Sequence, residues 1–141
     1  DTYLDELEEM LPPEEEYLQN LPIRRACEKT VELAIEVVID VLAIIVAEEQ
    51  LGFPAEEASL IAVLQKKGIL SEKLSQTIKL MKGFRNIIVH KYGEVDNEQA
   101  YEFLSAHLED FNAFEREIKE YLQRLPVGRQ FSSRRKSATA R

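Results

Sequence analysis

The sequence predicts an all-α protein that folds as an up-and-down helical bundle. Apolar residues recur at helical spacing along most of the chain, and no segment shows the alternating pattern of a strand. Of the 141 residues, only five are Gly and five are Pro, while 45% are hydrophobic and 31% are charged, a balance typical of globular domains. Because this length suits one hydrophobic core, we expect a single domain over residues 1–125 and a separate tail over residues 126–141.

The first two predicted helices are short and are separated by a pair of prolines. Three leucines recur at helical spacing in residues 1–11: Leu4, Leu7 and Leu11. Pro12-Pro13 ends this pattern, because Pro lacks the backbone N–H that a helix interior needs. The same prolines can open the next helix, since three glutamates at residues 14–16 would complement the dipole of its first turn.

A long helix over about residues 22–50 is expected to form the centre of the core. Its apolar positions follow the i, i+3, i+4, i+7 pattern: Val31, Ala34, Ile35, Val38, Leu42 and Ile45. Acidic residues interrupt this run, so it predicts a buried helix of a bundle and not a membrane span. Gly52 and Pro54 predict the helix end, with Gly52 as the C-cap.

A short helix over about residues 55–67 follows, and Gly68 closes it. Ser71 is the expected N-cap of the next helix. The apolar face of that helix includes Leu74, Ile78, Met81 and Ile88.

The last helix is expected to run unbroken to about Leu125, with Asp96 or Asn97 as its N-cap. Its apolar stripe comprises Tyr101, Leu104, Leu108, Phe111, Phe114, Ile118 and Leu122.

The charge distribution restricts how the chain could bind nucleic acid. The net charge is −8, and the tail over residues 126–141 carries +5 with no acid, which leaves −13 on the preceding residues. Residues 1–125 are too acidic for a general nucleic-acid binder, so any RNA contact requires a local basic site or the tail. The tail lacks periodicity and is expected to be disordered.

The cysteine and histidine counts restrict the chemistry and the compartment. One cysteine, Cys27, and two histidines argue against a Cys- or His-rich metal site, so no metal and no cofactor are expected. A lone cysteine also fits a reducing compartment, and no secretory signal opens the chain, so we expect a cytoplasmic location.

Residues 85–92 combine side chains that handle protons and phosphate. His90 can accept and donate a proton near neutral pH, and Arg85 offers a planar fork to phosphate oxygens. Five steps along a straight helix separate these two residues by about 140° around the axis. Either the helix bends near Gly83 or the site is assembled from two chains. An Arg and a His at this spacing also occur often by chance, and a single helical His is commonly structural.

The segment GFRNIIVHKY, residues 83–92, closely resembles the signature of HepT-like toxins within the HEPN group of helical ribonucleases. The segments around residues 68–71, residues 95–96 and Ile39-Asp40 are similar to the same family, and the resemblance covers about residues 23–125. It implies a HEPN-type bundle that acts as a homodimer. It also implies a metal-independent endoribonuclease toxin of a type VII-like toxin–antitoxin pair, with a 2′,3′-cyclic phosphate as product.

The same resemblance assigns roles to residues. Arg85 and His90 match the catalytic pair of the family, and Asn86 matches its polar neighbour. The motifs of two protomers would face one cleft, which would remove the difficulty of the angle between Arg85 and His90. The implied partner is an MntA-like nucleotidyltransferase antitoxin, which would silence the toxin by adding AMP to Tyr92.

Two alternatives remain open from the sequence. Asp40 lies in the most apolar part of the long helix, either as a buried carboxylate that orients Arg85 or His90, or as one of a solvated row of acids with Glu28, Glu32 and Glu36. The whole protein could also be a non-catalytic helical module that binds a nucleotide or RNA and partners a nucleotidyltransferase.

Overall fold

The computed structural model describes residues 2–52, 54–90 and 96–125, and within this range it does not describe the side chains of residues 89 and 90. These residues form α-helices and no strand, which confirms the predicted all-α class. In chain order the helices are α1 (Thr2–Met10), α2 (Glu14–Gln19), α3 (Leu21–Glu48), α4 (Glu57–Lys66), α5 (Glu72–His90), α6 (Asn97–Ala106) and α7 (Glu109–Arg124).

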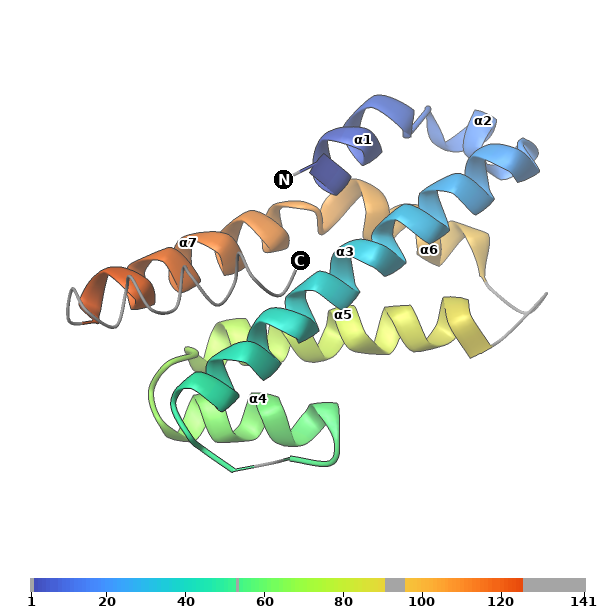
Figure 1. The fold of residues 1–141 in the computed structure, drawn as a ribbon. Coiled ribbons are helices and arrows are strands. Elements are labelled where there is room, and N and C mark those ends of the chain that lie inside the picture. Colours follow the sequence, from blue (N-terminus) through green and yellow to red (C-terminus); the bar gives the residue numbers. More distant parts are fainter. Residues whose placement is uncertain (1, 53, 91–95, 126–141) are drawn as a thin grey trace.

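The long helix α3 is the centre of the fold, as the sequence predicts. It crosses the middle of the molecule in Figure 1, and it packs against α1, α2, α4 and α5. All six of its predicted core positions are buried, and Leu4 and Leu7 of α1 are buried with them. None of the helices in the described residues is long and apolar enough to cross a membrane.

The predicted N-caps are confirmed. The Ser71 hydroxyl accepts a hydrogen bond from the backbone N–H of Leu74 at 3.1 Å, at the start of α5. The Asp96 carboxylate accepts from the N–H groups of Glu98 and Gln99 at 3.0 and 3.2 Å, at the start of α6. Each cap satisfies donors that the first turn of a helix otherwise leaves unpaired.

The C-cap of α3 differs from the prediction. The helix ends at Glu48, and Gln50 adopts a left-handed conformation with φ of 54°, while the N–H of Leu51 donates to the carbonyl of Val46 at 3.0 Å. This is the hydrogen-bond pattern of a Schellman motif, so Gln50 occupies the position that Gly52 was expected to fill. Gly68 does close α4 as predicted, with φ of 74°.

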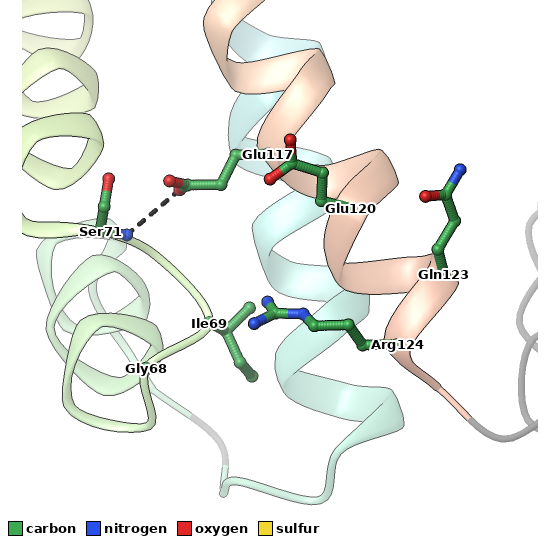
Figure 2. A pocket seen from close by; sticks show the side chains of 7 residues that line it. All are labelled: Gly68, Ile69, Ser71, Glu117, Glu120, Gln123 and Arg124. Atoms are coloured by element: carbon green, nitrogen blue, oxygen red, sulfur yellow. Dashed lines mark hydrogen bonds between the residues drawn. The ribbon is translucent and has the colours of Figure 1, made fainter.

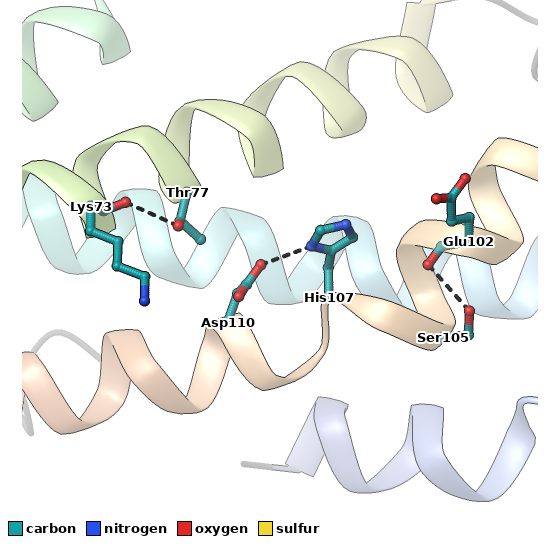
Figure 3. A network of polar contacts seen from close by, with 6 residues as sticks. All are labelled: Lys73, Thr77, Glu102, Ser105, His107 and Asp110. Carbon is teal, nitrogen blue, oxygen red and sulfur yellow. Dashed lines mark hydrogen bonds and ion pairs between the residues drawn. The ribbon is translucent and has the colours of Figure 1, made fainter.

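The prediction of one unbroken last helix is wrong, because the helix is interrupted between Ala106, the end of α6, and Glu109, the start of α7. The His107 imidazole lies 3.1 Å from the Asp110 carboxylate across this break (Figure 3). Glu109 and Asp110 occupy the first turn of α7, where acids stabilise a helix N-terminus. The change of direction lets α6 pack against α2 while α7 packs against α5.

Candidate functional site

Residues 85–90 of the segment that was predicted to hold the chemistry form the C-terminal part of α5. This helix continues through Gly83 to His90 without interruption. In a continuous helix, positions 85 and 90 lie about 140° apart around the axis. The side chain of His90 and all of Tyr92 lie outside the described residues.

The Arg85 side chain is held by two acceptors. Its Nη2 donates to the Glu57 carboxylate of α4 at 2.7 Å and to Oδ1 of the neighbouring Asn86 at 3.1 Å. Only 13% of the Arg85 side chain is exposed. Since a guanidinium carries five N–H donors, these two bonds leave the donors of Nη1 and Nε for another anion.

Glu57 is a residue that the sequence analysis missed. It lies 28 residues before Arg85, in the first turn of a different helix. An acid in the first turn of a helix is usually explained by its favourable interaction with the helix dipole. The helical periodicity of the two segments does not show that α4 and α5 pack together with these two residues in register.

Asp40 is exposed within the single chain, so it does not have the burial that its orienting role was expected to involve. The described partners of Arg85 are Glu57 and Asn86 instead. The solvated row of acids is not uniform either, because Glu28 is buried and pairs with Arg25 at 2.9 Å.

Asp40 does share a surface with exposed apolar side chains. Val37 and Ile44 lie three residues before and four residues after it on α3, and they are 41% and 38% exposed. On α5, Leu80 and Ile87 are 65% and 42% exposed, one pair of turns apart. We use the name α3–α5 face for these four exposed apolar side chains, two on each of two helices that pack against each other.

The α5 part of this face and position 90 of the motif lie on the same side of α5. Leu80, Gly83 and Ile87 follow one stripe of α5, and residue 90 follows Ile87 by three positions on the neighbouring stripe. Gly83 is exposed, and a Cβ built there would meet no atom of the described residues within 4 Å. Nothing described within the chain requires a glycine at this point in the helix, where Gly is destabilising.

A pocket of about 440 Å³ lies away from these residues, between the start of α5 and the end of α7 (Figure 2). The Ser71 N–H donates to the Glu117 carboxylate at its rim at 3.1 Å. A second pocket beside α6 is lined by carboxylates, among them Glu14, Asp96, Glu98 and Glu102. No predicted site residue lines either pocket, and the acids of the second disfavour phosphate.

A polar cluster is buried where α2 meets α3. Among the described residues, the Tyr17 hydroxyl, Arg24 Nε and Glu28 Oε1 have no hydrogen-bond partner. Burial, with the nearby charge of Glu28, raises the pKa of Tyr17, and the same two causes raise the pKa of Cys27. A buried and protonated Cys27 thiol is a poor nucleophile, so this cluster offers no reactive group. No set of three or more His, Cys, Asp or Glu side chains in the described part could hold a metal ion.

Comparisons with known proteins agree with the resemblance seen in the motif. A family model described as ribonuclease HepT-like matches residues 1–125. An mRNA nuclease HepT from Shewanella oneidensis is 31% identical over 94 residues, which are 67% of this chain and 65% of the relative. A tRNA nuclease HepT from Aphanizomenon flos-aquae is 26% identical over 108 residues, 77% of this chain and 74% of the relative. The match to the Shewanella protein thus spans slightly less than two thirds of that protein's length.

Solved structures share the fold. A tri-AMPylated Shewanella oneidensis HEPN toxin in complex with MNT antitoxin superimposes with a TM-score of 0.79 at 25% identity, over 84% of this chain and 90% of that one. The cytosolic protein YutE from Bacillus subtilis has a TM-score of 0.67 at 21% identity, over 87% of this chain and 94% of that one, which shows the fold alone.

Proposed function

The chain belongs to the ribonuclease HepT-like family, and we propose that it is a metal-independent endoribonuclease toxin that cuts RNA in a cleft shared by two copies of the chain. The observation that supports this most strongly is Arg85 at the motif position of the family. Its guanidinium is nearly buried and is held at Nη2, and the hydrogen bonds described for it do not use Nη1 or Nε, which we assign to a phosphate.

The chemistry follows from RNA having a hydroxyl beside each phosphodiester. His90 takes the proton of the 2′-hydroxyl, whose oxygen attacks phosphorus, and the bond to the 5′-oxygen breaks. A protonated imidazole returns a proton to the leaving 5′-oxygen. Arg85 stabilises the charge that develops on the phosphate oxygens. The products are a 2′,3′-cyclic phosphate and a free 5′-hydroxyl, and no step needs a metal ion.

The proposed dimer uses the α3–α5 face. Both helices carry exposed apolar side chains, the two helices are in contact, and position 90 follows Leu80 and Ile87 in the register of α5. A second copy on this face would bury Leu80 and Ile87 and could approach α5 closely at Gly83. It would also bring the C-terminal halves of the two α5 helices, and with them the two motifs, next to each other.

Asp40 and Asn86 complete the proposed site. Asp40 lies between Val37 and Ile44 on α3 and is exposed, so a second copy on this face would reduce its exposure and its charge would need a partner there. We assign it to orienting a basic side chain of the cleft. Asn86 accepts from Arg85 within the chain, which suits its assignment as an orienting residue.

The proposed partner is a nucleotidyltransferase antitoxin. This assignment rests on the similar HEPN toxin that is AMPylated and bound to an MNT antitoxin. Tyr92 follows the end of α5 by two residues, and an AMP group there would add bulk and negative charge next to the motif. Both effects would exclude RNA. A cytoplasmic location fits this function, because the RNA substrate is found there.

The test is RNA cleavage in EDTA by wild type, His90→Ala and His107→Ala. His107 is the other histidine of the chain, and it lies outside the motif segment, paired with Asp110 and stacked on Phe103, so its variant controls for the loss of an imidazole. We expect wild type and His107→Ala to release fragments ending in 2′,3′-cyclic phosphate, and His90→Ala to release none. Retained binding without cleavage by wild type would support the non-catalytic module. A requirement for divalent metal would contradict the proposed chemistry.

A further inference from the structure

The Arg85–Glu57 pair differs from every other ion pair within the described residues. The other pairs join positions on one helix or at its start, whereas this one joins α4 to α5. The two atoms are 2.7 Å apart, and the side chains are 13% and 37% exposed. A pair this short, made by a largely buried guanidinium, fixes the side chain in one orientation.

The pairing occupies one end of the guanidinium. Both described bonds leave from Nη2, one to Glu57 and one to Asn86, and this nitrogen has two N–H groups to donate. Because a guanidinium is planar, holding Nη2 from two directions also sets the direction of the Nη1 and Nε donors. These donors are the ones that remain for a phosphate.

Stability alone gives little reason for this contact, because partly exposed ion pairs contribute little to folding. Orientation gives a stronger reason. Arg has many rotamers, and a free side chain would lose that freedom each time it bound a phosphate. A carboxylate that orders the side chain beforehand removes this cost from the reaction.

We propose that Glu57 is the positioning residue of Arg85: it holds Nη2 so that Nη1 and Nε face the scissile phosphate. This inference rests on the proposed ribonuclease function. Glu57 touches neither RNA nor the reacting atoms in this scheme and acts through Arg85. Its charge also offsets that of Arg85, so removing the charge while keeping an acceptor strengthens the attraction of the site for phosphate.

The test compares Glu57→Gln and Glu57→Ala, with Glu56→Ala as the matched control. Glu56 is the adjacent acid, exposed, and its side chain makes no capping hydrogen bond. Gln keeps an oxygen that can accept from Nη2, whereas Ala removes it. We expect Glu57→Ala to lower kcat for RNA cleavage by about 10- to 100-fold. We expect Glu57→Gln to restore kcat to within about threefold of wild type with a lower KM, and Glu56→Ala to match wild type.

A second readout does not depend on cleavage. The NMR signal of the Arg85 Nε–H should report a rigid side chain in wild type and in Glu57→Gln, and a mobile one in Glu57→Ala. Unchanged kcat in Glu57→Ala, a loss confined to KM, or an Arg85 signal that stays rigid would each overturn the positioning role while the proposed function stands. If wild type itself cleaves no RNA, the proposed function fails first and this inference fails with it.

Discussion

At the scale of single residues, the main feature of the candidate site is the fixed position of the Arg85 side chain. Its guanidinium is fixed by an acid from another helix and by the amide of the next residue. The sequence singled out the motif because its residue types suit proton and phosphate chemistry. The partner Glu57 was not, since its contact depends on how α4 packs against α5. The burial of Asp40 stayed open from the sequence for a related reason: a neighbouring apolar sequence does not reveal which side of a helix the other helices cover.

Removing the hydroxyl of Tyr101 and removing that of Tyr17 should have different effects on the free energy of unfolding. The Tyr101 hydroxyl donates to the Pro12 carbonyl at 2.9 Å, whereas the buried Tyr17 hydroxyl has no partner among the described residues. Tyr101→Phe should therefore lower the free energy of unfolding by about 1 kcal/mol, and Tyr17→Phe should leave it unchanged or raise it by up to about 1 kcal/mol. The two rings lie 5.2 Å apart, so each substitution controls for the other.

Urea denaturation of both variants gives the measurement. A loss of more than about 1 kcal/mol in Tyr17→Phe would show that its hydroxyl does have a partner, such as a buried water.

At the scale of elements, the long helices and their N-caps could be predicted because they depend on local pattern. Ser71 and Asp96 cap their helices as expected. The break after α6 could not be predicted from periodicity, because apolar residues on both sides of it keep helical spacing. The acids at Glu109 and Asp110 were the local signal, and the packing of α6 against α2 decides the outcome.

The end of α3 gives a prediction of its own. Gln50 is the one non-glycine residue in the described part with a positive φ, at 54°. Gln50→Gly should raise the free energy of unfolding by about 0.5–1 kcal/mol, because glycine adopts this conformation without the clash of a Cβ. Gly68→Ala should lower it by about 1 kcal/mol, since Gly68 has φ of 74° although no described atom lies within 4 Å of the added Cβ.

Thermal unfolding of the two variants, compared with wild type, decides this. Equal melting temperatures for Gln50→Gly and wild type would mean that the left-handed conformation at Gln50 is not a source of strain.

At the scale of the whole molecule, the fold places positions 85 and 90 on different sides of α5. Arg85 is anchored toward α4, while residue 90 follows the exposed stripe of Leu80 and Ile87. The sequence suggested a site assembled from two chains for two reasons: the angle between positions 85 and 90 on a helix, and the resemblance to HEPN ribonucleases. The α3–α5 face adds a surface on which the second chain could bind.

The shared cleft is tested most directly by two measurements on the double variant Leu80→Glu/Ile87→Glu: its rate of RNA cleavage and its molecular mass in solution, which gives its oligomeric state. Two carboxylates on the α3–α5 face would oppose burial, so the variant should be monomeric and should lose cleavage. Leu21→Glu is the matched control, because Leu21 is 49% exposed at the start of α3, and it should remain dimeric and active. A monomeric double variant that still cleaves RNA at the rate of wild type would contradict the account.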